Sequence, residues 1–204
     1  MKTLLPLFIA FIGSFMYLQA CSISETTFID EDRNADALTF CEEQGFNTDF
    51  YIFIDMDVHS GKNRLFVYDF ITDTIIASGL CSHGCGEHPW SYDFSKETPA
   101  FSNIVDSHQS SLGKYKIGKR GYSNFGIHVN YRLHGLESTN DNSYERDIML
   151  HSWDVIENEE VYPAGCPEGW GCPAVSNEMM TLIDGLLKKS ALPVLLWIYR
   201  TETS

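Results

Sequence analysis

The sequence has few basic residues. It contains 14 Lys and Arg residues against 28 Asp and Glu residues, which gives a formal net charge of -14 at pH 7. A field of that sign repels the phosphate backbone of nucleic acids, so we expect no nucleic-acid partner. The acidity is typical of a well-solvated surface and does not identify a substrate.

The sequence also lacks internal repeats, low-complexity runs, and the loop patterns that bind phosphate or calcium. We therefore expect no cofactor and no metal. At 204 residues the chain is too short for two domains of ordinary size once a targeting segment is removed. Its 44% of hydrophobic residues is typical of a globular protein, so we expect one domain over residues 37–204.

Near the N-terminus, one apolar run covers residues 4–18 and follows the positive charge of Lys2. The run is short for a membrane span and has the layout of a secretory signal peptide. It predicts that residues 1–20 direct export and are removed. An uncleaved membrane anchor is the alternative.

The residues Leu18-Gln19-Ala20-Cys21 resemble the lipobox of bacterial lipoproteins. The resemblance implies that Cys21 is acylated and becomes the first residue of a periplasmic protein held at a membrane by its lipid. An ordinary cleavage site followed by an unrelated cysteine is the alternative. The polar residues 21–36 would then form a tether, because they can bury little apolar surface.

The rest of the chain is mainly β in pattern. A helix with Ser176 as its N-cap is predicted over residues 177–189, where apolar residues recur at helical spacing. Residues 81–126 are rich in loop-forming residues, and such a stretch inside a compact domain is usually functional. Strands are predicted at residues 51–58, 64–70 and 74–77, which together would form a meander, and at 148–150 and 194–199, whereas residues 114–117 are only a short apolar run.

Two residues late in the chain combine into a candidate catalytic pair. A cysteine nucleophile needs a base to form its thiolate. His151 follows a strand-like run, and Cys172 comes 21 residues later in Gly169-Trp170-Gly171-Cys172. The glycines would let the backbone turn sharply and direct successive N–H groups toward the oxyanion that forms in acyl transfer.

From about residue 41 to 199 the sequence resembles the bacterial murein L,D-transpeptidases with a YkuD-type catalytic domain. No single piece of the match is specific, but the set is. The matching pieces are Phe101-Ser102-Asn103, Ser107-His108-Gln109-Ser110-Ser111-Leu112-Gly113-Lys114-Tyr115, Leu133-His134-Gly135-Leu136-Glu137, Leu150-His151-Ser152 and Gly171-Cys172-Pro173-Ala174-Val175-Ser176.

The resemblance implies a YkuD-like β-sandwich with a late α-helix, and a peptidoglycan L,D-transpeptidase that acts on stem peptides. Cys172 would form an acyl-enzyme and pass the acyl group to an amine, with His151 as base. The backbone oxygen of Ser152 would orient His151, and the N–H groups of Trp170, Gly171 and Cys172 would form the oxyanion hole. The wider family often has Ser or Thr, then His, where this chain has Gly169 and Trp170, so His151 is the only base that the motif supports.

An earlier segment, Ser82-His83-Gly84-Cys85, spells the common family motif at the wrong place in the chain. We favour Cys172 over Cys85 as nucleophile, and we expect His83 and His108 to line the substrate groove. The cluster Cys81, His83, Cys85 and His88 offers a zinc site as an alternative, although its spacing is not a strong zinc pattern. In an oxidising compartment Cys41, Cys81, Cys85 and Cys166 would instead form up to two disulfides in one of three pairings.

Two rival functions remain open at the level of sequence. An L,D-carboxypeptidase of the same fold would use water in place of the amine, and the choice depends on the groove rather than on the Cys/His pair. A cell-wall-binding lipoprotein without activity would keep the fold alone. The presence of both His151 and Cys172 argues against the second rival.

Overall fold

A computed structural model describes residues 31–201 of the chain. Two α-helices, α1 (Glu31–Gln44) and α2 (Asn177–Leu187), and a short 3-10 helix (Asp141–Ser143) accompany eight strands. The strands form one sheet in the order β3-β2-β1-β8-β4-β5-β6-β7. Their bounds are β1 Phe50–Asp55, β2 Leu65–Asp69, β3 Thr74–Gly79, β4 Gly113–Tyr122, β5 Val129–Gly135, β6 Met149–Ser152, β7 Ala174–Val175 and β8 Leu195–Tyr199.

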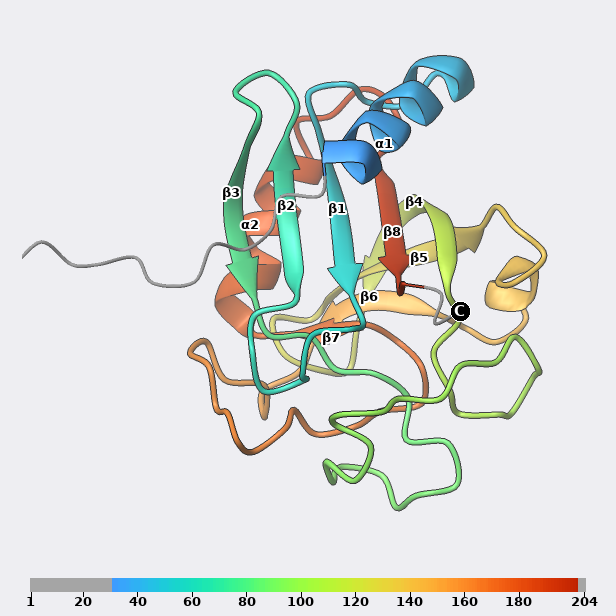
Figure 1. Cartoon of the computed structure of the whole chain (residues 1–204), viewed down its shortest axis with the longest axis vertical. Coiled ribbons are helices and arrows are strands. Elements are labelled where there is room, and N and C mark those ends of the chain that lie inside the picture. Colours follow the sequence, from blue (N-terminus) through green and yellow to red (C-terminus); the bar gives the residue numbers. More distant parts are fainter. Residues whose placement is uncertain (1–30, 202–204) are drawn as a thin grey trace, which may run out of the picture.

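The fold class predicted from the sequence, mainly β with a late helix, is confirmed. Strands β1, β2 and β3 pair antiparallel in chain order, as the predicted meander requires. They stand side by side with β8 in Figure 1, whereas β6 and β7 cross behind them. Strand β4 joins the two halves, because it pairs with β8 along its first residues and with β5 along its whole length.

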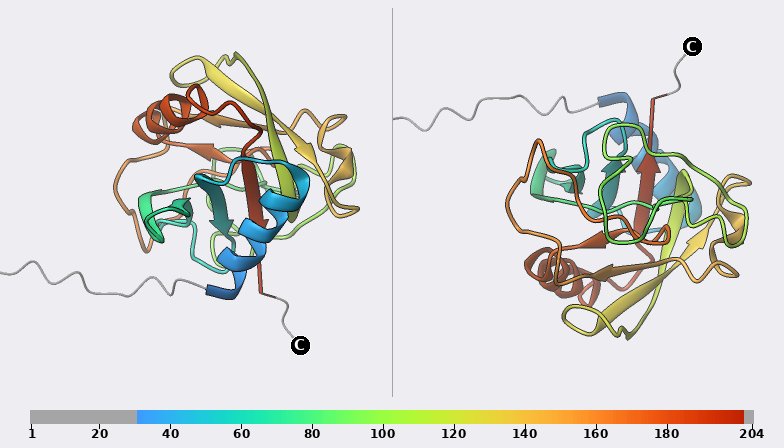
Figure 2. Two further views of the ribbon diagram at one scale, coloured as in Figure 1. Left: turned by 90° about the horizontal axis from the view of Figure 1, so that it is seen from above. Right: turned by 90° about the horizontal axis from the view of Figure 1, so that it is seen from below.

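The two halves of the bent sheet enclose the main core. Side chains of β1, β4, β5, β6 and β8 meet there with the apolar face of α2. Strand β1 is buried on both faces, because Ile52 and Ile54 point into this core while Tyr51 and Phe53 pack in a second cluster under α1. Figure 2 shows the two helices on opposite sides of the molecule. The two halves of one continuous sheet therefore pack face to face, as the two sheets of a β-sandwich do.

The expectation of a polar tether up to residue 36 was wrong at its end, where helix α1 begins. Residues 31–36, expected as the end of a polar tether, form its first turns. The helix packs on the sheet through Arg33, whose guanidinium lies 4.0 Å above the ring of Phe53, and through Asn34, which accepts a hydrogen bond from the Tyr51 hydroxyl at 2.5 Å. Fully buried Ala37 and Cys41 pack in the same cluster, so tertiary contacts of both polar and apolar side chains stabilise the helix.

Helix α2 agrees with its prediction. The Ser176 side chain accepts a hydrogen bond from the Met179 N–H at 3.2 Å, which satisfies one of the free donors at the helix start. Met179, Met180 and Ile183 are buried against the sheet. The helix ends at Leu187, two residues before the predicted end.

The long loops gather beyond one end of the upright strands, at the bottom of Figure 1. Residues 80–112 and 153–173 form most of this region. Two isolated bridges tie the loops together, Gly84 to Gly169 and Phe101 to Ser110. No helix within residues 31–201 has the length and apolar character needed to cross a membrane. The predicted signal peptide and Cys21 lie outside the described residues.

Candidate active site

Cys172 and His151 line the same cavity, which has a volume of about 150 Å³. The cavity lies where the loops meet strands β6 and β7. Aromatic side chains and backbone atoms form most of its wall. The lining residues are Ser82, Trp90, Phe125, His151, Trp153, Gly169, Trp170, Cys172 and Ala174.

His151 is fixed by a strand at the centre of the second half of the sheet. On β6 it pairs with Asn130 of β5 and with Ala174 of β7. Its Nδ1 atom lies 2.9 Å from the Ser152 carbonyl oxygen. A carbonyl oxygen only accepts, so Nδ1 carries the proton and Nε2 presents a lone pair. Burial lowers the pKa of His151, although the bond to Ser152 opposes that effect, and the imidazole is neutral near pH 7.

Cys172 lies beside the start of the same strand. Its sulfur accepts a hydrogen bond from the Met149 N–H at 3.3 Å, and the thiol points to the Asp147 carbonyl oxygen at 3.6 Å. Burial raises the pKa of the Cys172 thiol, and the Met149 N–H and the Arg146 charge oppose the rise. The group therefore rests as a thiol near neutral pH and needs a base to become a nucleophile.

The turn before Cys172 leaves three backbone donors free. Within residues 31–201 the N–H groups of Trp170, Gly171 and Cys172 meet no hydrogen-bond acceptor, whereas the Gly169 N–H donates to the His83 carbonyl at 2.8 Å. Gly171 has a φ of 96°, and a Cβ built on it would lie 2.5 Å from the Gln109 carbonyl oxygen. Only glycine fits this turn without movement of the neighbouring loop.

His108 lies at the rim of the site. Its ring stacks on that of Trp170 with centroids 4.9 Å apart and an interplanar angle of 16°. Both rings line a second, larger hollow of about 700 Å³, and Trp90 and Trp170 line both hollows. Trp170, at 61% exposure, therefore forms a partition between them. His108 does not line the cavity of Cys172 and His151, and its place in the substrate groove stays a prediction.

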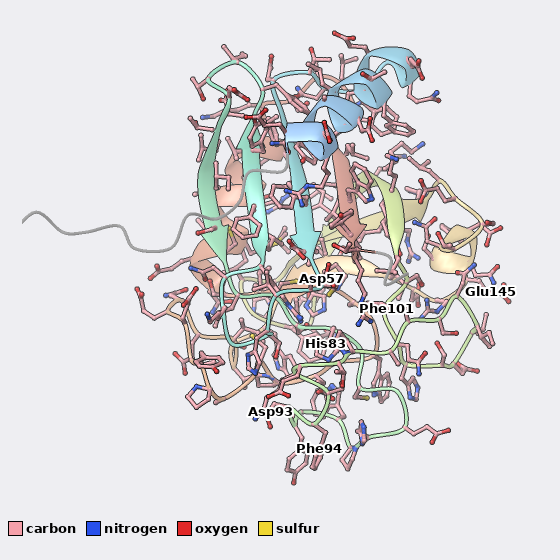
Figure 3. All side chains as sticks on the ribbon, viewed as in Figure 1. Asp57, His83, Asp93, Phe94, Phe101 and Glu145 are labelled. Carbon is pink, nitrogen blue, oxygen red and sulfur yellow. The ribbon has the colours of Figure 1, made fainter. Side chains whose placement is uncertain are left out.

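His83 occupies a different place from the one expected. The side chain is fully buried, among the loops below the sheet (Figure 3), and it does not line the catalytic cavity. Its Nδ1 accepts a hydrogen bond from buried Arg64 at 2.8 Å, and its Nε2 donates to Ser95 at 2.9 Å and lies 3.5 Å from the Glu168 carboxylate. Burial lowers the pKa of His83, which keeps the ring neutral. His83 thus supports the turn before Trp170 and does not reach a substrate.

Cys85 is also buried, and it lines only the larger hollow, away from His151. Its N–H donates to the Gly169 carbonyl at 2.7 Å, so the backbone of this segment braces the nucleophile turn. All five described cysteines are free thiols. Among residues 31–201 no group of three or more His, Cys, Asp or Glu side chains is placed to hold a metal ion.

Three parts of the site were not predicted from the sequence. Phe125 and Trp153 form much of the aromatic wall, and their rings lie 6.3 Å apart at 68°. Glu168 accepts two hydrogen bonds from Ser95, one from its N–H at 2.5 Å and one from its hydroxyl at 2.9 Å. Arg146 lies close enough to Cys172 for its charge to act on the thiol. No local sequence pattern marked either charged residue, because their contacts are with distant segments.

Comparisons with known proteins agree with the resemblance noted in the sequence. The model of the family YkuD_2, the L,D-transpeptidase catalytic domain, matches residues 26–199. A search of curated proteins found no match to the chain.

Among solved structures, the chain is similar to Bd1075 of Bdellovibrio bacteriovorus, at 16% identity over 76% of this chain and 49% of that one, with a TM-score of 0.44. It is also similar to the L,D-transpeptidase of Xylanimonas cellulosilytica, at 14% identity over 79% and 68%, with a TM-score of 0.40. Pgp2, a helical cell shape determining protein of Campylobacter jejuni, matches at 10% identity over 78% and 49%, with a TM-score of 0.45. The chain thus spans about half the length of two of these proteins. The assignment rests on the family model, whose match extends over most of the chain: the protein belongs to the L,D-transpeptidase catalytic domain family.

Proposed function

We propose that the protein is a peptidoglycan L,D-transpeptidase with Cys172 as nucleophile and His151 as general base. One observation carries the proposal. A thiol and an imidazole with an unprotonated Nε2 line one small cavity, and the three backbone N–H groups of residues 170–172 meet no acceptor within residues 31–201. A cysteine acyltransferase needs these three parts together: a nucleophile, a base that is itself oriented, and donors for an oxyanion.

In the proposed first half-reaction, Nε2 of His151 takes the proton of the Cys172 thiol. The thiolate attacks the carbonyl carbon of an L,D peptide bond in a stem peptide, and the N–H groups of Trp170, Gly171 and Cys172 hold the negative oxygen. The intermediate collapses, the C–N bond breaks, and His151 returns its proton to the leaving amine of the terminal D-residue. A thioester to the stem peptide remains on Cys172.

In the second half-reaction an acceptor amine attacks the thioester, and His151 removes a proton from the attacking nitrogen. The new amide forms as the thiolate leaves and is reprotonated. Aromatic side chains form much of the cavity wall around the sulfur. Such a wall offers apolar surface on which an acceptor amine can bind, which supports transfer to that amine. The L,D-carboxypeptidase is the reaction that follows when water enters instead.

Export and a lipid on Cys21 belong to the same proposal, because the substrate lies outside the cytoplasm. Their support is the sequence of residues 1–21 alone. Mass spectrometry of the N-terminus of the protein purified from membranes tests this part. A first residue Cys21 carrying acyl chains is expected, and an unmodified N-terminus at another residue would contradict it.

The reaction itself is tested by incubating the protein without residues 1–20 with disaccharide-tetrapeptide muropeptides and identifying the products by mass spectrometry. Cross-linked dimers or exchange of the terminal D-amino acid are expected from the wild type and from Cys85→Ala, and not from Cys172→Ala. Tripeptide as the sole product would favour the carboxypeptidase. Unchanged substrate with every variant would favour the wall-binding protein without activity.

A further inference from the structure

Arg146 is a half-buried cation next to the nucleophile. It lies one residue before Asp147, whose carbonyl oxygen is 3.6 Å from the Cys172 sulfur. The four acceptors of its guanidinium all lie on the loop of residues 102–111. Nη1 donates to the Ser102 carbonyl at 2.9 Å and to the Ser111 hydroxyl, and Nη2 donates to the Gln109 carbonyl and to the Ser107 hydroxyl at 3.4 Å.

The loop held by Arg146 in turn contacts the turn that carries the nucleophile. The Ser110 hydroxyl donates to the Gly171 carbonyl at 3.3 Å. A Cβ built on Gly171 would lie 2.5 Å from the Gln109 carbonyl oxygen and 3.2 Å from Nη2 of Arg146. The guanidinium, the loop and the Gly171 peptide therefore pack as one unit directly beside Cys172.

The acceptors of Arg146 are neutral, so its charge is not cancelled by a partner. No carboxylate within residues 31–201 forms an ion pair with it. The other charges that act on Cys172 are Asp147, which opposes the thiolate, and Arg132, which favours it, and these two pair with each other at 2.8 Å. His151, which lines the same cavity as Cys172, is a neutral ring. Arg146 is thus the uncompensated positive charge at the nucleophile.

We propose that Arg146 is a positioning residue for the nucleophile: its guanidinium holds the 102–111 loop against the Gly171 peptide, and its charge favours the thiolate of Cys172. The inference rests on the proposed role of Cys172 and adds a residue outside the matching pieces quoted from the sequence. The positive charge is needed because burial raises the pKa of this thiol. Only the Met149 N–H and nearby cations oppose that rise. Arginine suits the task because its guanidinium stays charged when half-buried and its fork reaches several acceptors at once.

The test is the rate at which iodoacetamide alkylates Cys172 between pH 6 and 10, read by peptide mass spectrometry so that the four buried cysteines do not interfere. Arg146→Met removes the charge, and Arg146→Lys retains it without the fork. Arg200→Met is the matched control, since Arg200 is also partly buried but lies against Pro99 and Phe101. Circular dichroism and thermal unfolding of each variant establish that it is folded.

We expect Arg146→Met to lower the alkylation rate at pH 7.5 at least about fivefold and to move the profile to higher pH, because thiolate is the reacting species. Arg146→Lys returns the rate to within about twofold of wild type, and Arg200→Met leaves the profile unchanged. A folded Arg146→Met protein with the wild-type profile would overturn the proposal. If Arg146→Met does not fold, Arg146→Gln replaces it, and failure of both neutral variants to fold would leave Arg146 a structural residue only and would also overturn the proposal.

The proposal that Arg146 holds the 102–111 loop is tested separately, by muropeptide turnover. Arg146→Lys should lower kcat while KM stays within about twofold, because a point charge cannot hold four acceptors and the turn loses its support. An unchanged kcat would refute this part. The alkylation assay contains no substrate, so a wild-type protein that turns over no muropeptide would contradict the proposed function and leave the test of Arg146 readable.

Discussion

The buried network of Arg64, His83 and Glu168 gives a sharp prediction for stability. All three side chains are fully buried, and the ring of His83 bridges the guanidinium at 2.8 Å and the carboxylate at 3.5 Å. Burial would raise the pKa of Glu168, but the hydrogen bonds from His83 and Ser95 outweigh it and keep the carboxylate charged. Glu168→Gln removes one of the two carboxylates whose charges act on the buried Arg64 cation, the other being Asp55.

Removal of one partner from a buried charge pair costs about 3–5 kcal/mol. For a domain of this size each kcal/mol lowers Tm by about 2–4 °C, so the expected drop is roughly 6–20 °C. Thermal unfolding followed by circular dichroism measures it. Glu145→Gln, at an exposed position that forms no ion pair within residues 31–201, is the control and should stay within about 0.5 kcal/mol of wild type. A drop below about 2 °C for Glu168→Gln would refute the reasoning.

Three further predictions concern the site and the late helix. Gly171→Ala should reduce muropeptide turnover by at least about 100-fold with little change in secondary structure. The φ of 96° at Gly171 and the nearby Gln109 carbonyl leave no room for a methyl group. Turnover within tenfold of wild type would count against a catalytic role for this turn. Burial lowers the pKa of His151, so the acid limb of the pH profile of kcat/KM should lie below pH 6.5, and activity should be retained at pH 6.5. An acid limb at pH 7 or above would show that this imidazole is not the base. Ser176→Ala should cost about 1 kcal/mol of unfolding free energy in urea, because the Met179 N–H loses its acceptor, and an unchanged midpoint would contradict the capping role.

The strands and the late helix were predictable because their signals are local. Strands β1, β2 and β3 follow runs of β-branched and aromatic residues separated by turn residues, and α2 has both an N-cap and an apolar face. Strand β5 alternates buried Val129, Tyr131 and Leu133 with polar residues, but the run is short and lies in a loop-rich region. Helix α1 was not predicted because it is stabilised by tertiary contacts, both the polar contacts of Arg33 and Asn34 with β1 and the burial of Ala37 and Cys41.

Some residues of the candidate site could likewise be predicted from the sequence, and others could not. Cys172 and His151 are visible in the sequence, because a family motif marks them. Arg146 and Glu168 are not, since their partners lie on segments about 35 to 85 residues away and no local pattern records those contacts. His83 was misplaced because Ser82-His83-Gly84-Cys85 spells a family motif, whereas the fold buries the ring between Arg64 and Glu168.

The central claim is that Cys172 carries the acyl group, and the most direct test is to trap that intermediate. The protein is mixed with a tetrapeptide muropeptide, quenched in acid within seconds, and analysed by intact and peptide mass spectrometry. We predict an adduct of the substrate minus its terminal D-amino acid, located on the peptide that contains Cys172, and no adduct in Cys172→Ala or His151→Ala. An adduct on Cys85, or one that persists in Cys172→Ala, would contradict the account.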